Sequence, residues 1–196
     1  MTDSLAPERV LPLLTGRFGS VYRYSETTPS TQRMLGPGDL EGTVAVADEQ
    51  TEGRGRLGRS WHAPAGTALL FSTLLIPAVE ASRLPELSLV AGDAVAEAIA
   101  DTTGLDPKIK FPNDILIEGR KVAGILAESS EGRVVLGIGV NANQEEAELP
   151  ADAQTEPTSL RLELGRRVDR AELLAAILAR LEPAYDSWLT GSARSG

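Results

Sequence analysis

Hydrophobic residues recur along the chain at two spacings, and each spacing predicts one kind of element. Three- and four-residue spacing predicts a helix at 85–103, which Gly104 ends, and a second from about Asp169, its N-cap, to Trp188. Short apolar or alternating runs predict strands at 21–25, 42–47, 68–76, 108–110, 115–117, 122–126 and 134–140.

Turn residues separate the last four predicted strands. The connections read Pro112-Asn-Asp, Glu118-Gly-Arg and Glu131-Gly-Arg, which are too short for helical crossovers, so these strands must run antiparallel. A doubly wound fold is therefore excluded. The pattern predicts an α+β fold in which helices pack on a mostly antiparallel, mixed central sheet. We expect one domain over 1–190 and a flexible tail at 191–196.

Composition narrows the class of protein. The 196 residues are 42% hydrophobic and 24% charged, which is typical of a folded globular chain. The absence of cysteine excludes disulfides, thiolate metal sites and a cysteine nucleophile. His62 is the only histidine, which excludes multi-histidine metal sites, and we expect it to be an ordinary loop residue. Without a signal peptide or an apolar run of membrane-spanning length, we expect a cytoplasmic protein with no membrane partner.

One segment concentrates positive charge in a chain whose net charge is -9. Residues 53–61 read Gly-Arg-Gly-Arg-Leu-Gly-Arg-Ser-Trp, with three arginines and no acid. This patch is too local for a nucleic-acid face, so we expect no DNA partner. Arginine binds carboxylate or phosphate and glycine permits motion, which together indicate a mobile lid over an anionic small molecule, with Trp61 available for stacking. A solvated glycine-rich hairpin is the alternative.

Four further sites carry candidate chemistry, each with an ordinary structural alternative. Ser30 and Thr31 are either ligand-binding hydroxyls or helix N-caps. Lys121 begins an apolar strand, where lysine is usually a solvated edge charge. Asn113 and Asp114 follow a proline and are by default turn formers. The strand at 137–143 alternates glycines, which weakens it unless something approaches its backbone.

In their order along the chain, these motifs resemble those of the biotin protein ligases. The motifs are Ser-Thr-Gln at 30–32, Gln50 followed by the arginine-glycine segment, Lys-Phe-Pro-Asn-Asp at 110–114, Lys-Val-Ala-Gly-Ile-Leu at 121–126 and Gly-Ile-Gly-Val-Asn at 137–141. The resemblance implies a core related to class II aminoacyl-tRNA synthetases. It also implies that biotin and MgATP form biotinyl-5'-AMP, which then acylates one lysine of a biotin carboxyl carrier domain.

The resemblance also implies roles for individual residues. Around biotin it places Ser30, Thr31, Gln50, Arg54, Gly55, Arg56, Lys121 and Gly124. Around ATP it places Arg56, Arg59, Trp61, Asn113, Lys121 and Asn141. The implied catalytic set is Lys121, Arg54, Arg56 and Asp114, where Lys121 bridges the biotin carboxylate and the phosphate. Asp114 would act near the incoming lysine or serve as a magnesium ligand, and sequence does not separate these tasks.

The chain departs from the family pattern at three points. Only some twenty residues precede the first predicted strand, too few for the DNA-binding module of many relatives, so we expect no operator binding. The chain stops where many relatives continue into an SH3-like barrel. Phe111 stands where the family usually has tryptophan, and we expect it to serve as packing. Two alternatives to a biotin protein ligase remain. One is a lipoate or octanoate transferase, and the other is a domain that binds biotin or its adenylate without transferring it.

Overall fold

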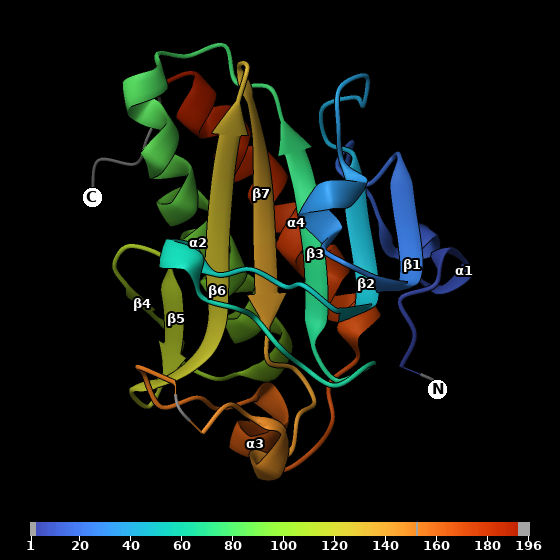
Figure 1. The fold of residues 1–196 in the computed structure, drawn as a ribbon, viewed down its shortest axis with the longest axis vertical. Helices are drawn as coiled ribbons and strands as arrows, with labels where there is room; N and C mark the ends of the chain where they lie inside the picture. The colour runs from blue at the N-terminus through green and yellow to red at the C-terminus, as the bar shows by residue number, and fades with distance from the viewer. Residues whose placement is uncertain (1–2, 152, 192–196) are drawn as a thin grey trace.

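The computed structural model describes residues 3–151 and 153–191, with a seven-stranded mixed sheet at the centre (Figure 1). The strands lie in the order β1-β2-β3-β7-β6-β5-β4, where β1 and β2 are parallel and every other neighbouring pair is antiparallel. Their bounds are β1 Tyr22–Thr28, β2 Val44–Gln50, β3 Leu69–Leu75, β4 Lys108–Lys110, β5 Asp114–Ile117, β6 Arg120–Ser130 and β7 Arg133–Val140. The predicted α+β class is confirmed. Of the expected tail at 191–196, residues 192–196 lie outside the described part.

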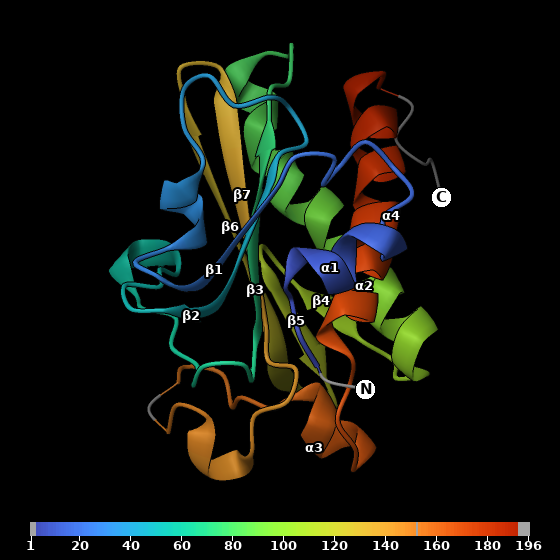
Figure 2. The same cartoon turned by 90° about the vertical axis from the view of Figure 1, so that its right-hand side faces the viewer.

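The long helices cover one face of the sheet and leave the other to loops. α2 (Leu87–Thr103) and α4 (Arg170–Leu189) lie side by side on one face, with the short α1 (Pro7–Val10) beside them (Figure 2). The main hydrophobic core fills the space between these helices and the sheet. On the opposite face lie two short 3-10 turns, η2 (Thr31–Met34) and η3 (Arg56–Gly58), while α3 (Leu160–Leu164) lies at one end. The helix-free face is therefore where a ligand can approach the strands.

Local chemistry sets the limits of both long helices. Gly104 takes the left-handed conformation with φ 77° and ends α2, as predicted. The Asp169 side chain accepts hydrogen bonds from the backbone nitrogens of Ala171 and Glu172, which confirms it as the N-cap of α4. The predicted start of α2 at residue 85 is two residues early, because Ala81–Glu86 forms a 3-10 turn and the α-helix begins at Leu87.

Two tight hairpins align the strands that carry the site. Glu118 and Gly119 both have positive φ, at 49° and 80°, and Glu131 and Gly132 repeat this pair at 51° and 76°. Two consecutive positive φ values are typical of the hairpin turn whose twist matches the flanking strands. The second hairpin places Gly124 of β6 directly opposite Gly139 of β7.

A buried arginine joins the sheet to α4. Arg170 is 2% exposed, and its guanidinium pairs with Asp3 and Asp48 at 2.9 Å each. It also donates to the Ala68 carbonyl oxygen at 3.0 Å. The Tyr24 hydroxyl donates to Asp48 as well, and this hydrogen bond together with burial raises the pKa of Tyr24 to about 12. The network links the chain start and strands β1 and β2 to the first turn of α4.

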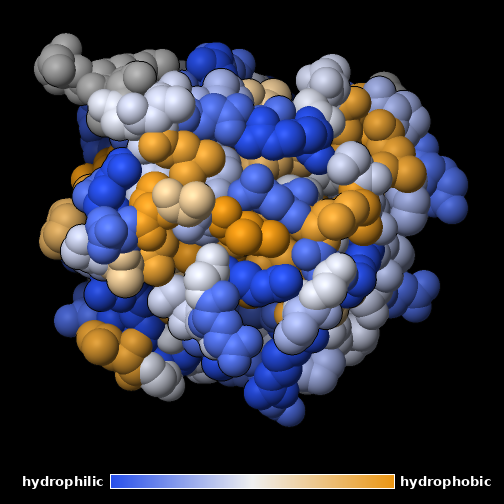
Figure 3. All heavy atoms as spheres, turned by 90° about the horizontal axis from the view of Figure 1, so that it is seen from above, coloured by the Kyte–Doolittle hydropathy of each residue, from blue (hydrophilic) through white to orange (hydrophobic). Residues whose placement is uncertain are grey.

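Seen from above, this end of the molecule carries hydrophobic side chains in a broken band across the view, with hydrophilic side chains among and around them (Figure 3). None of the helices in the described residues is both long and apolar enough to cross a bilayer.

Replacing Arg170 with alanine should lower the free energy of unfolding by about 3 kcal/mol, because Asp3 and Asp48 lose their buried partner. Urea denaturation measures this. Arg180→Ala is the matched control: its ion pairs with Glu97 and Asp101 leave the arginine side chain 45% exposed, so its loss should cost less than about 1 kcal/mol. Equal losses in the two variants would contradict a special role for the Arg170 network.

Candidate active site

A cleft of about 580 Å³ opens on the helix-free face of the sheet. It lies between η2, the arginine-glycine segment, strands β6 and β7, and a loop whose described residues are 150, 151 and 153–157, called here the loop at 150–157. All thirteen residues that the sequence assigned to the site line this cleft. Residues up to 111 positions apart in the chain therefore converge in one place, from Ser30 to Asn141.

Neutral hydrogen-bonding groups gather at one part of the cleft wall. The Gln50 Oε1 atom accepts from the Thr31 backbone nitrogen at 2.8 Å and from its hydroxyl at 3.1 Å. The Thr31 hydroxyl also lies 2.7 Å from that of Ser72 on β3. Sequence reasoning missed Ser72, whose signal was a pair of hydroxyl residues, Ser72 and Thr73, within an apolar strand. These groups suit a ligand that carries neutral donors and acceptors.

The capping alternative for Ser30 is not seen. Ser30 precedes η2, yet its side chain makes no capping hydrogen bond, and the residue is 2% exposed against the cleft. Gln32, which was not predicted, is 8% exposed and donates to the Leu126 carbonyl at 3.1 Å and to that of Val135 at 3.4 Å. Both residues stand at the start of η2 and also line the cleft wall.

The arginine-glycine segment folds into a narrow hairpin over the cleft. Arg54 and Ser60 form an isolated antiparallel bridge, and the Gly55 nitrogen donates to the Arg59 carbonyl at 2.7 Å. Gly53 leaves no space for a side chain, because a Cβ there would lie 2.2 Å from the Trp61 carbonyl oxygen. The glycine-rich hairpin of the alternative interpretation is therefore present: most of its residues are exposed, and it also lines the cleft.

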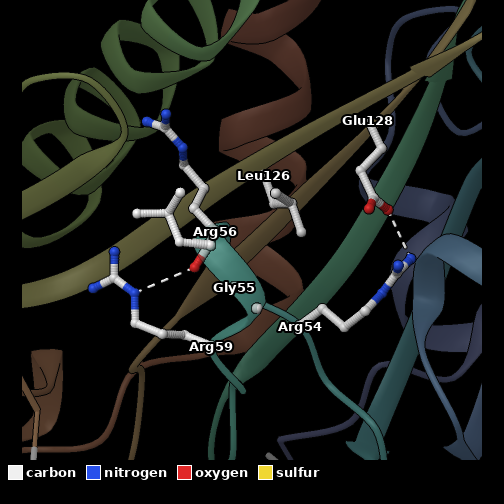
Figure 4. Close-up of a pocket in the computed structure, with 8 residues that line it drawn as sticks. Arg54, Gly55, Arg56, Arg59, Leu126 and Glu128 are labelled. Carbon is white, nitrogen blue, oxygen red and sulfur yellow. Dashed lines mark hydrogen bonds and ion pairs between the residues drawn. The ribbon is translucent and has the colours of Figure 1, made fainter.

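The three arginines of this hairpin point in different directions (Figure 4). Arg54 extends along the sheet to Glu128 of β6 at 2.7 Å and also donates to Gln32 at 3.3 Å. Arg59 donates to the Arg56 carbonyl and, at 2.9 Å, to Gln154 of the loop at 150–157. The Arg54–Glu128 pair thus fastens the hairpin to the sheet.

Trp61 lies flat on the floor of the cleft. A Cβ added to Gly139 would lie 2.7 Å from the indole, and one added to Gly124 would lie 2.9 Å from it. Gly139 of β7 and Gly124 of β6 are therefore explained by the ring, which needs a strand surface without side chains, whereas a Cβ at Gly137 would meet the Gln32 side chain at 3.0 Å. The indole nitrogen is buried without an acceptor in the described residues, so packing holds the ring there.

Lys121 faces Asp114 inside the cleft. The ammonium lies 2.7 Å from the Asp114 carboxylate and 5.6 Å from the centre of the Trp61 ring. The lysine side chain is 23% exposed and that of Asp114 is 17% exposed. The edge-charge interpretation of Lys121 is wrong, because β6 lies between β5 and β7.

The two predicted asparagines are engaged by protein groups. Asn113 donates to the Ile125 carbonyl at 3.0 Å and accepts from Arg56 at 3.2 Å. Asn141 is 6% exposed, donates to the Thr158 carbonyl at 2.9 Å and accepts from Gln144 at 3.0 Å. Both side chains therefore hold the walls of the cleft in place.

The loop at 150–157 closes one side of the cleft, and no sequence signal pointed to it. Lys110 donates to Thr155 at 2.9 Å. The backbone nitrogen of Lys121 donates to the Glu156 carbonyl oxygen at 2.7 Å, and the backbone nitrogen of Thr158 donates to the Lys121 carbonyl oxygen at 2.8 Å. The backbone that presents Lys121 is thus held by this loop. His62 is exposed and lies at the cleft.

The family model described as "Biotin/lipoate A/B protein ligase family" matches residues 24–145, which is most of the chain and includes all the site residues before the loop at 150–157. The chain belongs to this family.

Relatives and solved structures extend the match. The chain is 37% identical to "Bifunctional ligase/repressor BirA" of Bacillus subtilis, over 91% of this chain and 58% of that protein. It is 36% identical to "Biotin--[acetyl-CoA-carboxylase] ligase" of Paracoccus denitrificans, over 88% of this chain and 80% of that one. The structure of a biotin protein ligase from Aquifex aeolicus, in complex with biotin and ATP, superposes with a TM-score of 0.79 at 35% identity, over 87% of this chain and 72% of that one. The chain thus spans little more than half the length of the Bacillus relative.

Replacing Glu128 with glutamine should loosen the family's arginine-glycine hairpin, because Arg54 loses its ion pair. Both side chains are about two fifths exposed, so the effect should be modest, at roughly two- to fivefold faster trypsin cleavage after Arg54 or Arg56. Mass spectrometry of the fragments measures it. Glu97→Gln removes a comparable charge from the pair with Arg180, on the helix layer, and should leave that rate unchanged. Unchanged cleavage in Glu128→Gln would contradict the fastening role.

Proposed function

We propose that the chain is an ATP-dependent ligase that activates biotin as biotinyl-5'-AMP and passes the biotinyl group to a lysine of a carrier domain. The observation that carries the proposal is one cleft that combines neutral polar groups, a floor of strands without side chains at Gly124 and Gly139, and four lysine or arginine side chains. The neutral groups of Thr31, Gln50 and Ser72 match a ureido ring, which needs donors and acceptors without charge. The dithiolane ring of lipoate has no such requirement, and this favours biotin within the family.

In the first step, a biotin carboxylate oxygen attacks the α-phosphorus of ATP and pyrophosphate leaves. This brings two anions together, so cations must offset the charge and water must be kept from the product. Lys121 lies on the cleft floor and Arg56 and Arg59 lie in the hairpin above it, which suits them to this task. Gly55 and Gly124 allow the ligand to approach the backbone. Trp61, with Asn113 and Asn141 behind it, would receive the adenosine part.

In the second step, the carrier amine attacks the acyl carbonyl carbon, a C–N bond forms and AMP leaves. The attacking amine must be neutral and must lose a proton afterwards. Asp114 is the carboxylate that lines the cleft beside Lys121, and we assign to it the orientation of this amine. Arg54 would act at a distance, by holding the hairpin through Glu128.

Magnesium would arrive with the ATP phosphates. Among the described residues, no three histidine, aspartate or glutamate side chains are grouped to hold a metal ion. Protein sites for nucleotide-bound magnesium commonly supply only one or two carboxylates, and Asp114 fits that requirement. The ion would add positive charge at the phosphates.

Pyrophosphate release tests the reaction itself. The chain mixed with MgATP should release pyrophosphate when biotin is added and should not do so with lipoate or octanoate. Release with lipoate in place of biotin would favour the acyltransferase alternative. Binding of biotin without any release would favour a non-catalytic binding domain.

Lys121→Ala should slow biotin-dependent pyrophosphate release about 100-fold or more, because it removes a cation from the point where negative charge collects. Lys108→Ala is the matched control, since Lys108 is 73% exposed and pairs only with Asp106 in the described structure. It should keep the wild-type rate. A folded Lys121→Ala variant within about twofold of wild type, checked by circular dichroism, would contradict the assignment.

A further inference from the structure

Two large hydrophobic side chains are exposed on segments whose neighbouring residues line the cleft. Phe111 is 76% exposed and Leu57 is 89% exposed. The sequence-based expectation that Phe111 serves as packing is therefore wrong. We propose that Phe111 and Leu57 form a docking surface for the carrier protein that presents the acceptor lysine. The proposal rests on the proposed function and adds the surface that the second substrate uses.

Phe111 lies close in sequence to Asp114, one of the side chains assigned to the reaction. It follows β4, the last strand of the sheet, and lies three residues before Asp114, which pairs with Lys121 inside the cleft. Its neighbour Lys110 donates to Thr155 of the loop that lines the cleft. The ring thus stands on the outer side of a short segment whose other end enters the site.

Leu57 reaches the same rim from the hairpin. Its backbone takes the left-handed conformation, with φ 58° and ψ 36°, which costs free energy for a residue other than glycine. The side chain gains no burial in return. The adjacent Arg56 donates to Asn113 at 3.2 Å, and this hydrogen bond joins the hairpin tip to the segment that carries Phe111. The two apolar side chains therefore flank one joined rim.

The charge around this rim indicates which kind of partner surface would fit it. Arg56, Arg59 and Lys110 are exposed around this rim, although the whole chain carries a net charge of -9. A complementary partner presents acidic residues around an apolar contact. Small substrates that enter the cleft need no apolar side chains outside it. A folded carrier needs an apolar contact outside the cleft, because its lysine must be brought across the rim to Asp114.

The test separates docking from chemistry by changing the nucleophile. The unbiotinylated carrier domain of a biotin-dependent carboxylase from the same organism serves as the large acceptor, and hydroxylamine serves as the small one. Hiding one large apolar side chain in an interface is worth about tenfold in affinity. Phe111→Ser should therefore lower kcat/KM for the carrier about tenfold, mainly through KM. Pyrophosphate release without carrier and transfer to hydroxylamine should stay within about twofold of wild type.

Two further variants and one control complete the design. Phe111→Trp keeps a large apolar ring and should retain carrier transfer. Leu57→Ser should lower the ratio of carrier transfer to hydroxylamine transfer. Leu40→Ser is the matched control, because Leu40 is 67% exposed in a loop before β2 and should leave that ratio unchanged.

Three results would overturn the docking surface. One is an unchanged kcat/KM for the carrier in both serine variants. Another is an equal loss with carrier and hydroxylamine, which would place these residues in the chemistry instead. The third is an equal fall for Leu40→Ser. Failure of the wild-type chain to release pyrophosphate would count instead against the proposed function.

Discussion

The contact between the Trp61 indole and two facing glycines organises the site. Gly124 and Gly139 pair across β6 and β7, and their missing side chains leave a flat area at the centre of the sheet. The indole fills this area at distances that no Cβ would permit. Because Trp61 ends the arginine-glycine hairpin, one packing contact anchors that hairpin to the strands that also carry Lys121.

The rest of the cleft is built outward from this anchor. The Trp61 backbone nitrogen donates to the Gly53 carbonyl oxygen at 2.9 Å and closes the hairpin stem, and Arg54 extends from that stem to Glu128. On the other side of the ring, Lys121 is held by Asp114 and by the loop at 150–157. The cations are thus fixed by contacts to the protein before any ligand binds, which is the condition for electrostatic stabilisation without reorganisation.

Sequence reasoning succeeded where the signal was local. Hydrophobic spacing placed the long helices and the strands, and Gly104 and Asp169 act at the helix limits as their chemistry required. The motif set also brought together the residues that converge in the cleft. Sequence reasoning failed where a property depends on strand order or on contacts between residues far apart in the chain. The position of β6 inside the sheet excluded the edge-charge interpretation of Lys121, and no local pattern indicates that Phe111 is exposed or that Arg54 pairs with Glu128.

The most direct test of this account is the Trp61 fluorescence of Gly139→Ala in a Trp188→Phe background, where Trp61 is the only tryptophan. A Cβ at 2.7 Å must displace the indole, so emission should shift to longer wavelength, and biotin-dependent pyrophosphate release should fall about tenfold or more in a folded variant. Gly92→Ala, whose nearest contact is an ordinary 3.5 Å, should change neither. Unchanged emission and unchanged release in Gly139→Ala would contradict the claim that the glycine floor positions the site.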